Sequence, residues 1–568
     1  MYFWICNYYK QEKLYFLLIV WVCKKIGEIM YISEVRIKNY RTFEDVTFHF
    51  DSCSNYLVGD NNIGKSNFLA FLKTITHGYG FREDDFLNPR EPISVFLTLA
   101  AEDIGIQETV GIELRQSIHE VVPTLLHSAT NEVLPLEYMR TLFYLEYSIE
   151  EIPRNLVTAD ELEKAREIYK SYFSVEEHVK NIRNLLAERK ISVHIPDDPE
   201  VAADMLVSLI FGRSDKPPIF GSTMQLLFAI ASHLLVRLSE KKKSRAVSFD
   251  DIVVVNKEGK KYFPLTISID EPELHLHPYL QRAVLAFLQS VLNNREPVFC
   301  QMIQYILGVD GLDGQLFVVT HSTDALVNDY RQIVRLYRNK EGKVQVACGA
   351  DFHFGNEIEK HLIMHFPEMK EAFYSRCAIL VEGETEYGSF PYFARTIGVN
   401  FDYHGICLIN ARGESSIIKI AQLIRRFHIP VVCLYDRDVM EENHTEYIFY
   451  TDYICFEMDV VKACLSNGHV KYLRDAILAT GATSDFVNSS LVKKAAQKLN
   501  LDKRLYSSRK LDNISARDKK ALTFYYFAWL YGNKGVITGR ALGEGLSKSD
   551  IPSAFKKVIE TAVSYVEG

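Results

Sequence analysis

The sequence lacks the features that mark zinc-binding, disulfide-bonded and membrane-spanning proteins. It has ten cysteines among 568 residues, and no two of them form a CxxC pair or a Cys/His spacing typical of a zinc site. Their scatter favours reduced, mostly buried thiols and a cytoplasmic location. The apolar run at residues 14–23 falls well short of the about 20 residues that a membrane-spanning helix needs. We therefore expect no membrane segment.

Positive charge is also scarce for a protein that contacts nucleic acid over a broad surface. The net charge is −8, so any contact with nucleic acid has to use a local basic patch. The sequence contains no internal repeat, no low-complexity tract and no long heptad arm of the kind that tethers DNA in a ring. A chain of 568 residues exceeds one typical hydrophobic core, which predicts two or more domains.

The first 29 residues differ in pattern from the rest of the chain. They contain the apolar run between lysines, whereas Met30 opens an alternating apolar pattern typical of strands. We interpret residues 1–29 as a non-native or flexible N-terminal extension. A membrane-attached N-terminus is the alternative.

A phosphate-binding loop is the most informative motif in the chain. Residues 59–66 read GDNNIGKS and fit GxxxxGK[ST], between an apolar strand pattern and a helical apolar face. Glycines let backbone N–H groups converge on phosphate, the lysine reaches the β- and γ-phosphates, and the serine ligates Mg²⁺. A chance glycine turn does not explain strand, loop and helix together. The residues assigned to the nucleotide are Gly59, Asn61, Asn62, Gly64, Lys65, Ser66 and Asn67.

Two later strand patterns end in residues that would complete an ATPase. Residues 265–271 (LTISIDE) end in Asp270, placed to hold Mg²⁺, and Glu271, placed to polarise the attacking water. Residues 316–321 (LFVVTH) end in His321, which can contact the γ-phosphate. Taken singly, the acids could cap a helix and the histidine could belong to the core. Their order along the chain favours the functional interpretation.

Two further segments indicate contacts with other molecules. Residues 220–227 (FGSTMQLL) open a helix with small polar residues, which suits phosphate contact across a dimer interface. Residues 150–205 contain a charged stretch with helical period, which predicts a helical insertion. That insertion is either an interaction element or a solvated hairpin without a partner.

The C-terminal half carries a second group of acidic residues. Residues 377–386 (CAILVEGETE) form a strand pattern that runs into Glu382, and residues 430–438 (PVVCLYDRD) form another that ends at Asp436 and Asp438. In a parallel α/β sheet such strand ends converge at one edge. Carboxylate oxygens favour Mg²⁺ or Mn²⁺. Helix capping by the acids is the alternative, but two such strands favour a metal site.

These motifs resemble known families. The P-loop, DEPELHLHP at 270–278 and THS at 320–322 are similar to ABC-type ATPases of the SMC and RecF group, although FGSTMQ departs from the usual LSGGQ signature. The Glu382 and Asp436-x-Asp438 pair resembles the TOPRIM domain of topoisomerases, primases and recombination nucleases. An ATPase head followed by TOPRIM resembles the OLD (overcoming lysogenization defect) nuclease family, including Gabija-type defence nucleases, over nearly all of residues 30–545.

The resemblance implies cofactors and further site residues. Glu386 matches a second metal-binding glutamate, Glu457 and Asp459 are further ligand candidates, and Lys534 matches the lysine that stabilises charge on the scissile phosphate. The implied cofactors are ATP and Mg²⁺, with Mn²⁺ or Ca²⁺ as alternatives at the nuclease site. The catalytic candidates are Glu271, Glu382, Asp436, Asp438 and Lys534. The metal-ligand candidates are Ser66, Asp270, Glu382, Glu386, Asp436, Asp438 and Glu457.

The expected fold is α/β in two parts. Residues 30–350 would form an ABC-type (SMC/RecF-like) P-loop ATPase head with a helical, dimerising insertion at 150–205, and residues 366–568 a TOPRIM Rossmann-like nuclease domain. The expected function is an ATP-regulated, divalent-metal-dependent DNA endonuclease in antiphage defence or DNA processing. The alternative is an ATP-driven DNA-binding sensor or clamp without nuclease activity. The expected partners are DNA, a second copy of the chain and, in the Gabija-type case, a helicase-like protein.

Overall fold

The computed structural model describes most of the chain as two compact units. It describes residues 30–103, 106–141, 143–148, 159–188, 194–211, 222–243, 249–256, 258–274, 276–326, 329–439, 445–481 and 485–567. The first unit ends at Asp351 and the second begins at Phe352. The expected extension at residues 1–29 lies outside the described part. Within the described part, no helix combines the length and apolar character needed to cross a membrane.

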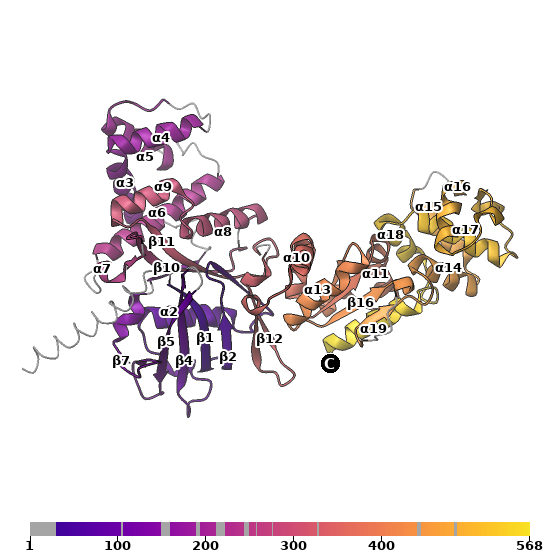
Figure 1. Cartoon of the computed structure of the whole chain (residues 1–568), viewed down its shortest axis with the longest axis horizontal. Helices are drawn as coiled ribbons and strands as arrows, with labels where there is room; N and C mark the ends of the chain where they lie inside the picture. Colours follow the sequence, from indigo (N-terminus) through magenta and orange to yellow (C-terminus); the bar gives the residue numbers. More distant parts are fainter. Residues whose placement is uncertain are drawn as a thin grey trace, which may run out of the picture. The chain divides into compact units, whose positions relative to one another are not determined.

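An antiparallel sheet forms one layer of the first unit (Figure 1). Its described strand order is β2-β1-β4-β5-β6-β7. The alternating pattern that opens at Met30 is confirmed as the antiparallel pair of β1 and β2, and β4 and β5 form a second antiparallel pair. The strands are β1 (Met30–Tyr40), β2 (Phe43–His49), β4 (Ile93–Asp103), β5 (Ile106–Gln116), β6 (Thr124–His127) and β7 (Val133–Leu134).

A mostly parallel sheet forms the second layer and carries the nucleotide motifs. Its described order is β13-β12-β3-β11-β10-β8, with β9 paired to β10. The P-loop strand β3 pairs in parallel with β11, and β11 pairs in parallel with β10. The motifs at the ends of these three strands therefore share one edge of the sheet. The strands are β3 (Ser54–Val58), β8 (Phe143–Ser148), β9 (Val254–Val255), β10 (Lys261–Asp270), β11 (Gly311–Val319), β12 (Ile333–Arg338) and β13 (Val344–Cys348).

Helix α2 (Lys65–His77) joins the core of both sheets. Its apolar face carries Phe68 and Phe71, whose side chains are fully buried. The Phe68 ring centroid lies 4.5 Å from that of Phe48 on β2 and 5.9 Å from that of Phe317 on β11. Burial of one such side chain contributes about 1.5–3 kcal/mol. The apolar stripe therefore fixes the helix, and the loop before it, against both sheets.

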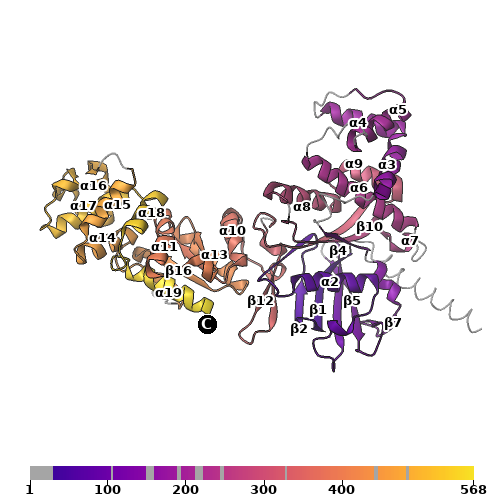
Figure 2. The same cartoon turned by 180° about the vertical axis from the view of Figure 1, so that it is seen from behind.

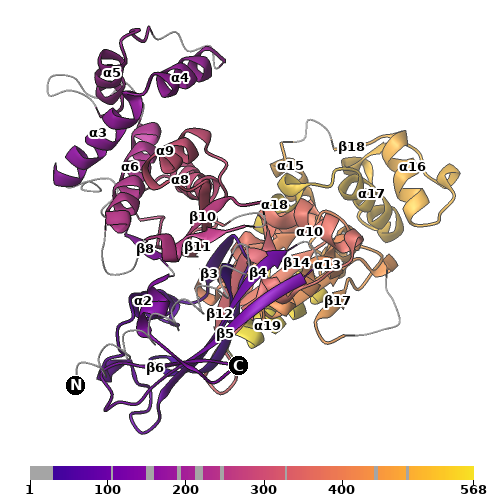
Figure 3. The ribbon, with the colours of Figure 1, turned by 60° about the vertical axis from the view of Figure 1, so that its left-hand side comes forward.

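The expected helical insertion is present in the first unit. Helices α3 and α5 pack on each other and both contact α4, while α3 also contacts α6 and α9. In Figures 2 and 3, α4 and α5 lie beyond α6 and α9, and α3 runs beside these helices. The FGSTMQ segment is described only from Ser222, where α6 begins. The helices are α3 (Ala159–Phe173), α4 (Glu176–Glu188), α5 (Pro199–Phe211), α6 (Ser222–Lys243), α8 (Pro278–Leu292) and α9 (Pro297–Leu307).

The second unit is built on a parallel sheet with the described order β15-β14-β16-β17. Every residue of β14 is buried, as expected for a central strand covered on both faces. The chain passes from β14 outward to β15 through α11 and back across to β16 through α13, and crossovers of the same hand in opposite directions put these helices on opposite faces of the sheet. The elements are β14 (Cys377–Val381), α11 (Glu384–Ile397), β15 (Ile406–Asn410), α13 (Glu414–Arg426), β16 (Val431–Tyr435) and β17 (Ile448–Tyr450).

Further helices complete the second unit. Helix α10 contacts α13, α19 contacts three strands of the sheet, and α18 packs along α11. Helices α14 to α17 form a neighbouring helical layer that shares the hydrophobic core of the sheet. They are α10 (Asn356–Met369), α14 (Phe456–Ser466), α15 (Val470–Ala479), α16 (Ser489–Lys498), α17 (Lys519–Gly532), α18 (Val536–Gly545) and α19 (Ser553–Glu567).

A candidate nucleotide site and a candidate metal centre

The loop between β3 and α2 has a backbone that requires glycine at both ends. Gly59 has φ of +137° and Gly64 has φ of +117°. A Cβ atom on Gly59 would lie 2.3 Å from the carbonyl oxygen of Leu336, and one on Gly64 would lie 2.4 Å from the Thr42 hydroxyl. Asn62 also has a positive φ, of +59°. The chain therefore turns tightly here and exposes its backbone at the start of α2.

Lys65 is held inside this loop. Its Nζ donates hydrogen bonds to the carbonyl oxygens of Gly59 (3.0 Å) and Asp60 (2.8 Å). Burial lowers the pKa of Lys65, and nearby carboxylates, Asp60 first, partly offset that effect. A buried ammonium whose hydrogen bonds go to carbonyl oxygens gains by facing an anion. The side chain is therefore placed and charged to receive phosphate.

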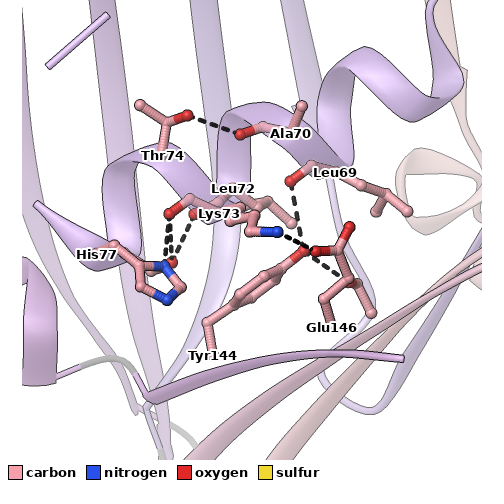
Figure 4. A network of polar contacts seen from close by, with 10 residues as sticks. Leu69, Ala70, Leu72, Lys73, Thr74, His77, Tyr144 and Glu146 are labelled. Carbon is pink, nitrogen blue, oxygen red and sulfur yellow. Dashed lines mark hydrogen bonds and ion pairs between the residues drawn. The ribbon is translucent and has the colours of Figure 1, made fainter. Parts of the chain in front are cut away.

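Helix α2 is fastened to the strands that carry the rest of this site (Figure 4). The Tyr144 hydroxyl on β8 donates to the Leu69 carbonyl (3.3 Å) and bonds to the Ser268 hydroxyl on β10 (2.5 Å). Lys73 forms an ion pair with Glu146 at 2.5 Å (Figure 4). These contacts hold the P-loop helix at a fixed distance from the end of β10.

Asn67, the last of the P-loop residues assigned to the nucleotide, faces the protein. Its side-chain amide donates to the Thr42 hydroxyl (3.2 Å), and its carbonyl oxygen accepts from Arg41 (3.1 Å). Asn61 and Asn62, by contrast, are exposed. Asn67 therefore supports the loop, while the two loop asparagines remain open to solvent.

Asp270 and Ser66 meet at the end of β10. Burial raises the pKa of Asp270, and its hydrogen bond with the Ser66 hydroxyl partly offsets that effect. Asp270 Oδ1 is buried and has no hydrogen-bond partner among the described residues. A buried carboxylate oxygen without a donor is costly unless a cation faces it. The pair therefore fits a Mg²⁺ ion that accompanies a nucleotide.

Glu271 and His321 lie beside this pair. Glu271 has φ of +48°, a left-handed conformation that costs a non-glycine residue about 1–3 kcal/mol. Its N–H bonds to the Val319 carbonyl at 2.8 Å, which ties Glu271 to the end of β11. His321 Nε2 lies 4.0 Å from Glu271 Oε1. Burial, and then the Lys65 charge, lower the pKa of His321, which keeps the imidazole neutral.

Glu273 is a residue of this site that the sequence did not single out. Its carboxylate accepts hydrogen bonds from the Thr320 hydroxyl (2.7 Å) and from the His321 N–H. Glu273 therefore ties the turn after β10 to the end of β11 and fixes His321 relative to Glu271. The only signal in the sequence is its place within DEPELHLHP, which does not say what the fourth residue contacts.

We expect Glu273→Ala to lower ATP hydrolysis by about 10- to 100-fold, because small misplacements at a reacting centre have effects of this size. ATP binding should persist, since the P-loop is untouched. Glu273→Gln should fall between wild type and alanine, because its amide oxygen can still accept one of the two hydrogen bonds. Phosphate release and nucleotide-binding titrations separate the two effects. Glu341→Ala, at an exposed turn, is the control, and wild-type hydrolysis by Glu273→Ala would contradict this role.

The acids of the second unit meet where two neighbouring strands end. Val381 of β14 pairs with Leu434 of β16 in parallel register, so Glu382 and Asp436 follow adjacent strand ends. The Glu382 carboxylate forms a hydrogen bond with the backbone of Asp436, although burial raises its pKa overall. Asp436 Oδ1 accepts a hydrogen bond from the N–H of Phe456, at the start of α14, at 3.1 Å. The structure thus brings together the two expected acidic motifs.

Two more glutamates and a lysine complete what we call the acidic cluster: Glu382, Glu386, Asp436, Glu457 and Lys534. Glu386 is 5% exposed and Glu457 is fully buried. Lys534 Nζ lies 3.1 Å from Glu457 Oε2. Partial burial by itself would lower the Lys534 pKa, but the surrounding carboxylates, Glu457 first, raise it above its ordinary value. Lys534 therefore stays charged beside the acids.

Close helix packing brings Lys534 to the cluster. Lys534 precedes α18, which lies against α11. A Cβ atom on Gly388 of α11 would lie 2.5 Å from the Val536 carbonyl oxygen, and one on Gly539 of α18 would lie 2.1 Å from that of Thr385. Only glycine allows the two helices this approach. The Gly535 N–H then bonds to the Thr385 hydroxyl at 3.0 Å and fixes the turn that carries the lysine.

Asp438 and Asp459 have different surroundings. Asp438 forms an ion pair with Lys498, at the end of α16, a partner that the sequence did not indicate. Asp459 accepts hydrogen bonds from the N–H groups of Asp452 (2.8 Å) and Tyr453 (2.6 Å). Burial raises the pKa of Asp459 to about 7. Asp459 therefore holds the loop before α14, whereas Asp438 stays at the edge of the cluster.

The residues of the acidic cluster fit a divalent cation. Glu382 Oε2 and Glu457 Oε1 are buried without a hydrogen-bond partner among the described residues, whereas Glu457 Oε2 faces the Lys534 ammonium. Such oxygens are stabilised by a facing cation, and hard oxygen ligands suit Mg²⁺ or Mn²⁺. In the described chain no three acidic, histidine or cysteine side chains are already gathered as a ligand set. The residues that would hold an ion are Glu382, Glu386, Asp436, Asp438 and Glu457.

The cluster predicts a pH-dependent response to Mg²⁺. Burial, followed by repulsion between the carboxylates, raises the pKa of Glu386 to about 7 and that of Asp436 to about 8. Both values lie above those of the unfolded chain, so the folded state binds more protons and the metal-free protein loses stability as pH rises through this range. Metal binding needs the ionised groups, so Mg²⁺ should raise the melting temperature more at about pH 8.5 than at about pH 6.

Differential scanning fluorimetry with Mg²⁺ or EDTA measures this response. Glu386→Gln should weaken the dependence on pH, because it removes one titrating ligand. Asp402→Asn, an exposed acid of the same unit, should leave it unchanged. An equal Mg²⁺ effect at both pH values in the wild type would contradict the prediction.

Three protein families match parts of the chain. The family described as "Overcoming lysogenization defect protein-like, TOPRIM domain" matches residues 373–438, which include Glu382, Glu386 and Asp436. The AAA ATPase domain family matches residues 30–194, which include the P-loop. The family described as "AAA domain, putative AbiEii toxin, Type IV TA system" matches residues 126–328.

Curated relatives match parts of the chain. The Old nuclease of Escherichia phage P2 is 23% identical over 279 residues, which are 46% of this chain and 41% of that protein. The DNA replication and repair protein RecF of Bacillus cytotoxicus is 42% identical over 64 residues, which are 11% of this chain and 16% of that protein. The chain thus spans about two-fifths of the Old nuclease that it matches.

Solved structures also resemble parts of the chain. The C-terminal region of the Burkholderia pseudomallei OLD protein has 18% identity and a TM-score of 0.24, and the match covers 34% of this chain and 99% of that one. The SMC head domain from Thermotoga maritima has 13% identity and a TM-score of 0.29, with 56% and 97% covered.

The family matches and the strand topology together confirm the expected fold class and the expected resemblance to the OLD family. An ATPase domain joined to a TOPRIM domain indicates the use of a nucleotide and of divalent metal ions in general. The chain thus matches an AAA ATPase domain family over residues 30–194 and an OLD-like TOPRIM domain family over residues 373–438.

Proposed function

We propose that this protein is an ATP-regulated DNA endonuclease whose cutting centre is the acidic cluster of the second unit. The observation that carries this proposal is the adjacency of the β14 and β16 ends, which gathers Glu382 and Asp436 beside Lys534. Structural acids at strand ends are normally satisfied by helix N–H groups. Here Glu382, which follows β14, keeps a buried oxygen without a hydrogen-bond partner among the described residues, and so does Glu457 on α14. That arrangement supports cation binding rather than helix capping.

The carboxylates and the lysine of the cluster would have different roles in phosphodiester cleavage. Divalent ions held by the carboxylates would stabilise the attacking and leaving oxygens. Asp436 keeps its orientation through the Phe456 N–H, which bonds to one carboxylate oxygen and leaves the other for an ion. The Lys534 side chain remains 40% exposed, so a phosphate can approach it from solvent. Its raised pKa keeps the positive charge that would neutralise the scissile phosphate.

The first unit would regulate this chemistry through ATP. Lys65 and Ser66 would bind the phosphates and their ion, while Glu271 would orient the attacking water and His321 would contact the γ-phosphate. Glu273 holds the turn and the strand end that carry these last two side chains. Hydrolysis would therefore change the conformation at the ends of β10 and β11, and these strands would transmit the change to the rest of the unit.

The proposal includes partners and a location. DNA is the proposed substrate, a second copy of the chain is the proposed partner, and a helicase-like protein is a further proposed partner in antiphage defence. The described cysteines are free thiols, which supports a reducing, cytoplasmic location. The helical insertion α3–α5 is the proposed dimerising element.

We expect the purified protein to be at least a dimer. Light scattering with and without ATP should give a mass of at least twice 65.3 kDa. A variant in which residues 159–211 are replaced by a short glycine-serine linker should lose this association while it still binds ATP. A monomeric mass for the wild type under both conditions would contradict the proposed assembly.

A cleavage assay tests the proposed function. Supercoiled plasmid is incubated with the protein and Mg²⁺ or Mn²⁺, with ATP, with a non-hydrolysable analogue and without nucleotide. We expect nicked or linear products that depend on the metal and vanish with EDTA, and a rate that changes with nucleotide. DNA binding without any metal-dependent product would instead favour an ATP-driven clamp.

A further inference from the structure

A second lysine lies at the acidic cluster and has no role in the function proposed above. Lys498 ends α16 and forms an ion pair with Asp438. The pair is partly enclosed, with side-chain exposures of 21% for Lys498 and 33% for Asp438. Asp438 is one of the charges that raise the pKa of Glu382, so it lies within electrostatic reach of the cluster. Lys498 thus neutralises a carboxylate that is also a candidate metal ligand.

An aromatic ring links this lysine to the lysine of the cluster. Lys498 Nζ lies 5.8 Å from the centroid of the Tyr531 ring, and Lys534 Nζ lies 5.0 Å from the same centroid. Both ammonium groups are within the distance at which a ring attracts a cation. Tyr531 therefore offers Lys498 a second favourable contact when its ammonium leaves Asp438.

We propose that Lys498 is a resident counter-ion of Asp438 that competes with a divalent cation and is drawn away by DNA phosphate. This inference rests on the proposed nuclease function and adds a coupling between DNA binding and metal binding. A carboxylate oxygen paired with an ammonium is less available as a ligand. Phosphate that attracts Lys498 frees Asp438, so DNA binding strengthens metal binding, and by reciprocity metal binding strengthens DNA binding.

Lysine chemistry suits this exchange. A lysine ammonium is a compact charge on a flexible stem and binds phosphate as a point charge. The Asp438 pair is partly exposed, and such pairs are worth little, so a stronger partner can replace one of the two groups. The acidic cluster also carries more carboxylates than lysines, which favours a divalent ion once Asp438 is free.

Metal affinity in the absence of DNA tests the first half of the proposal. Mn²⁺ binding is measured by calorimetry without nucleotide for the wild type and for Lys498→Met. We expect the variant to bind Mn²⁺ about 5-fold more tightly, because the competing charge is gone. Lys494→Met, an exposed lysine one turn earlier on α16, is the matched control and should behave as wild type. If Lys498→Met melts at a lower temperature than wild type in EDTA, the same measurement is made on Lys498→Gln, which keeps a polar side chain at this position.

The effect of a divalent ion on DNA affinity tests the second half of the proposal. The affinity for a short fluorescent duplex is measured at low and high Ca²⁺. Wild type and Lys494→Met should bind DNA about 5-fold more tightly at high Ca²⁺, whereas Lys498→Met should lose most of that gain. Unchanged Mn²⁺ affinity in both Lys498 variants, or a retained Ca²⁺ gain, would overturn the proposal.

The two failures are distinguishable. If the wild type binds Mn²⁺ and Asp436→Asn weakens that binding, the proposed metal centre is supported, whether or not the Lys498 variants change Mn²⁺ affinity. If the wild type shows no Mn²⁺ binding that depends on Asp436, the proposed nuclease function fails together with this inference.

Discussion

Replacing Asp436 by asparagine is expected to lower metal-dependent DNA cleavage by more than about 100-fold, since even outer-shell partners of metals contribute about 10- to 100-fold. The substitution is nearly isosteric, and the asparagine oxygen can still accept the N–H of Phe456 that Asp436 Oδ1 accepts at 3.1 Å. The lost negative charge, rather than a lost fold, should therefore account for the effect. Burial and repulsion from Glu386 raise the pKa of Asp436, so the neutral amide should leave the metal-free protein at least as stable.

Plasmid nicking and ATP hydrolysis, measured on the same preparation, check this result. ATP turnover should remain near wild type, because Asp436 belongs to the second unit. Asp402→Asn, which changes an exposed acid of that unit, should cut normally. Normal cutting by Asp436→Asn would show that the acidic cluster is not the cutting centre.

Replacing Lys65 by alanine is expected to lower ATP hydrolysis by more than about 100-fold. Removal of one preorganised charge at a reacting centre typically has an effect of this size. Lys65 Nζ bonds to two carbonyl oxygens of the loop, at 3.0 and 2.8 Å, and no other lysine lies in that loop. Burial lowers its pKa, so the ammonium gains by facing a phosphate.

Phosphate release at saturating ATP measures the loss, and Lys340→Ala at an exposed turn is the control. DNA cleavage by Lys65→Ala, with and without ATP, then shows the direction of regulation. Cleavage that no longer responds to ATP is expected. Full ATP turnover by this variant would place hydrolysis at another site.

The sequence predicted the parts of both sites whose geometry is local. The P-loop can be read from residues 59–66 alone, because its two glycines, lysine and serine act within one turn. Glu382 and Asp436 could be paired in advance because both end buried strand patterns, and parallel strands align their ends. The alternation that predicts β1 and β2 is likewise a local property of the chain.

The sequence did not predict contacts that depend on how distant elements pack. Glu273 reaches Thr320 and His321 only because β10 and β11 are neighbours in the sheet. Lys498 meets Asp438 across 60 residues. Lys534 was suggested by family resemblance, but its approach depends on glycines at 388 and 539 that let α11 and α18 pack closely. None of these contacts leaves a spacing pattern in the chain.

The most direct measurement of the central claim is a crystal structure of the protein with Mn²⁺ at a wavelength where manganese scatters anomalously. We predict at least one anomalous peak between the Glu382 and Asp436 carboxylates, and its disappearance in Asp436→Asn crystals. Peaks confined to Ser66 and Asp270, with none at the acidic cluster, would contradict the account of this protein as a metal-dependent nuclease.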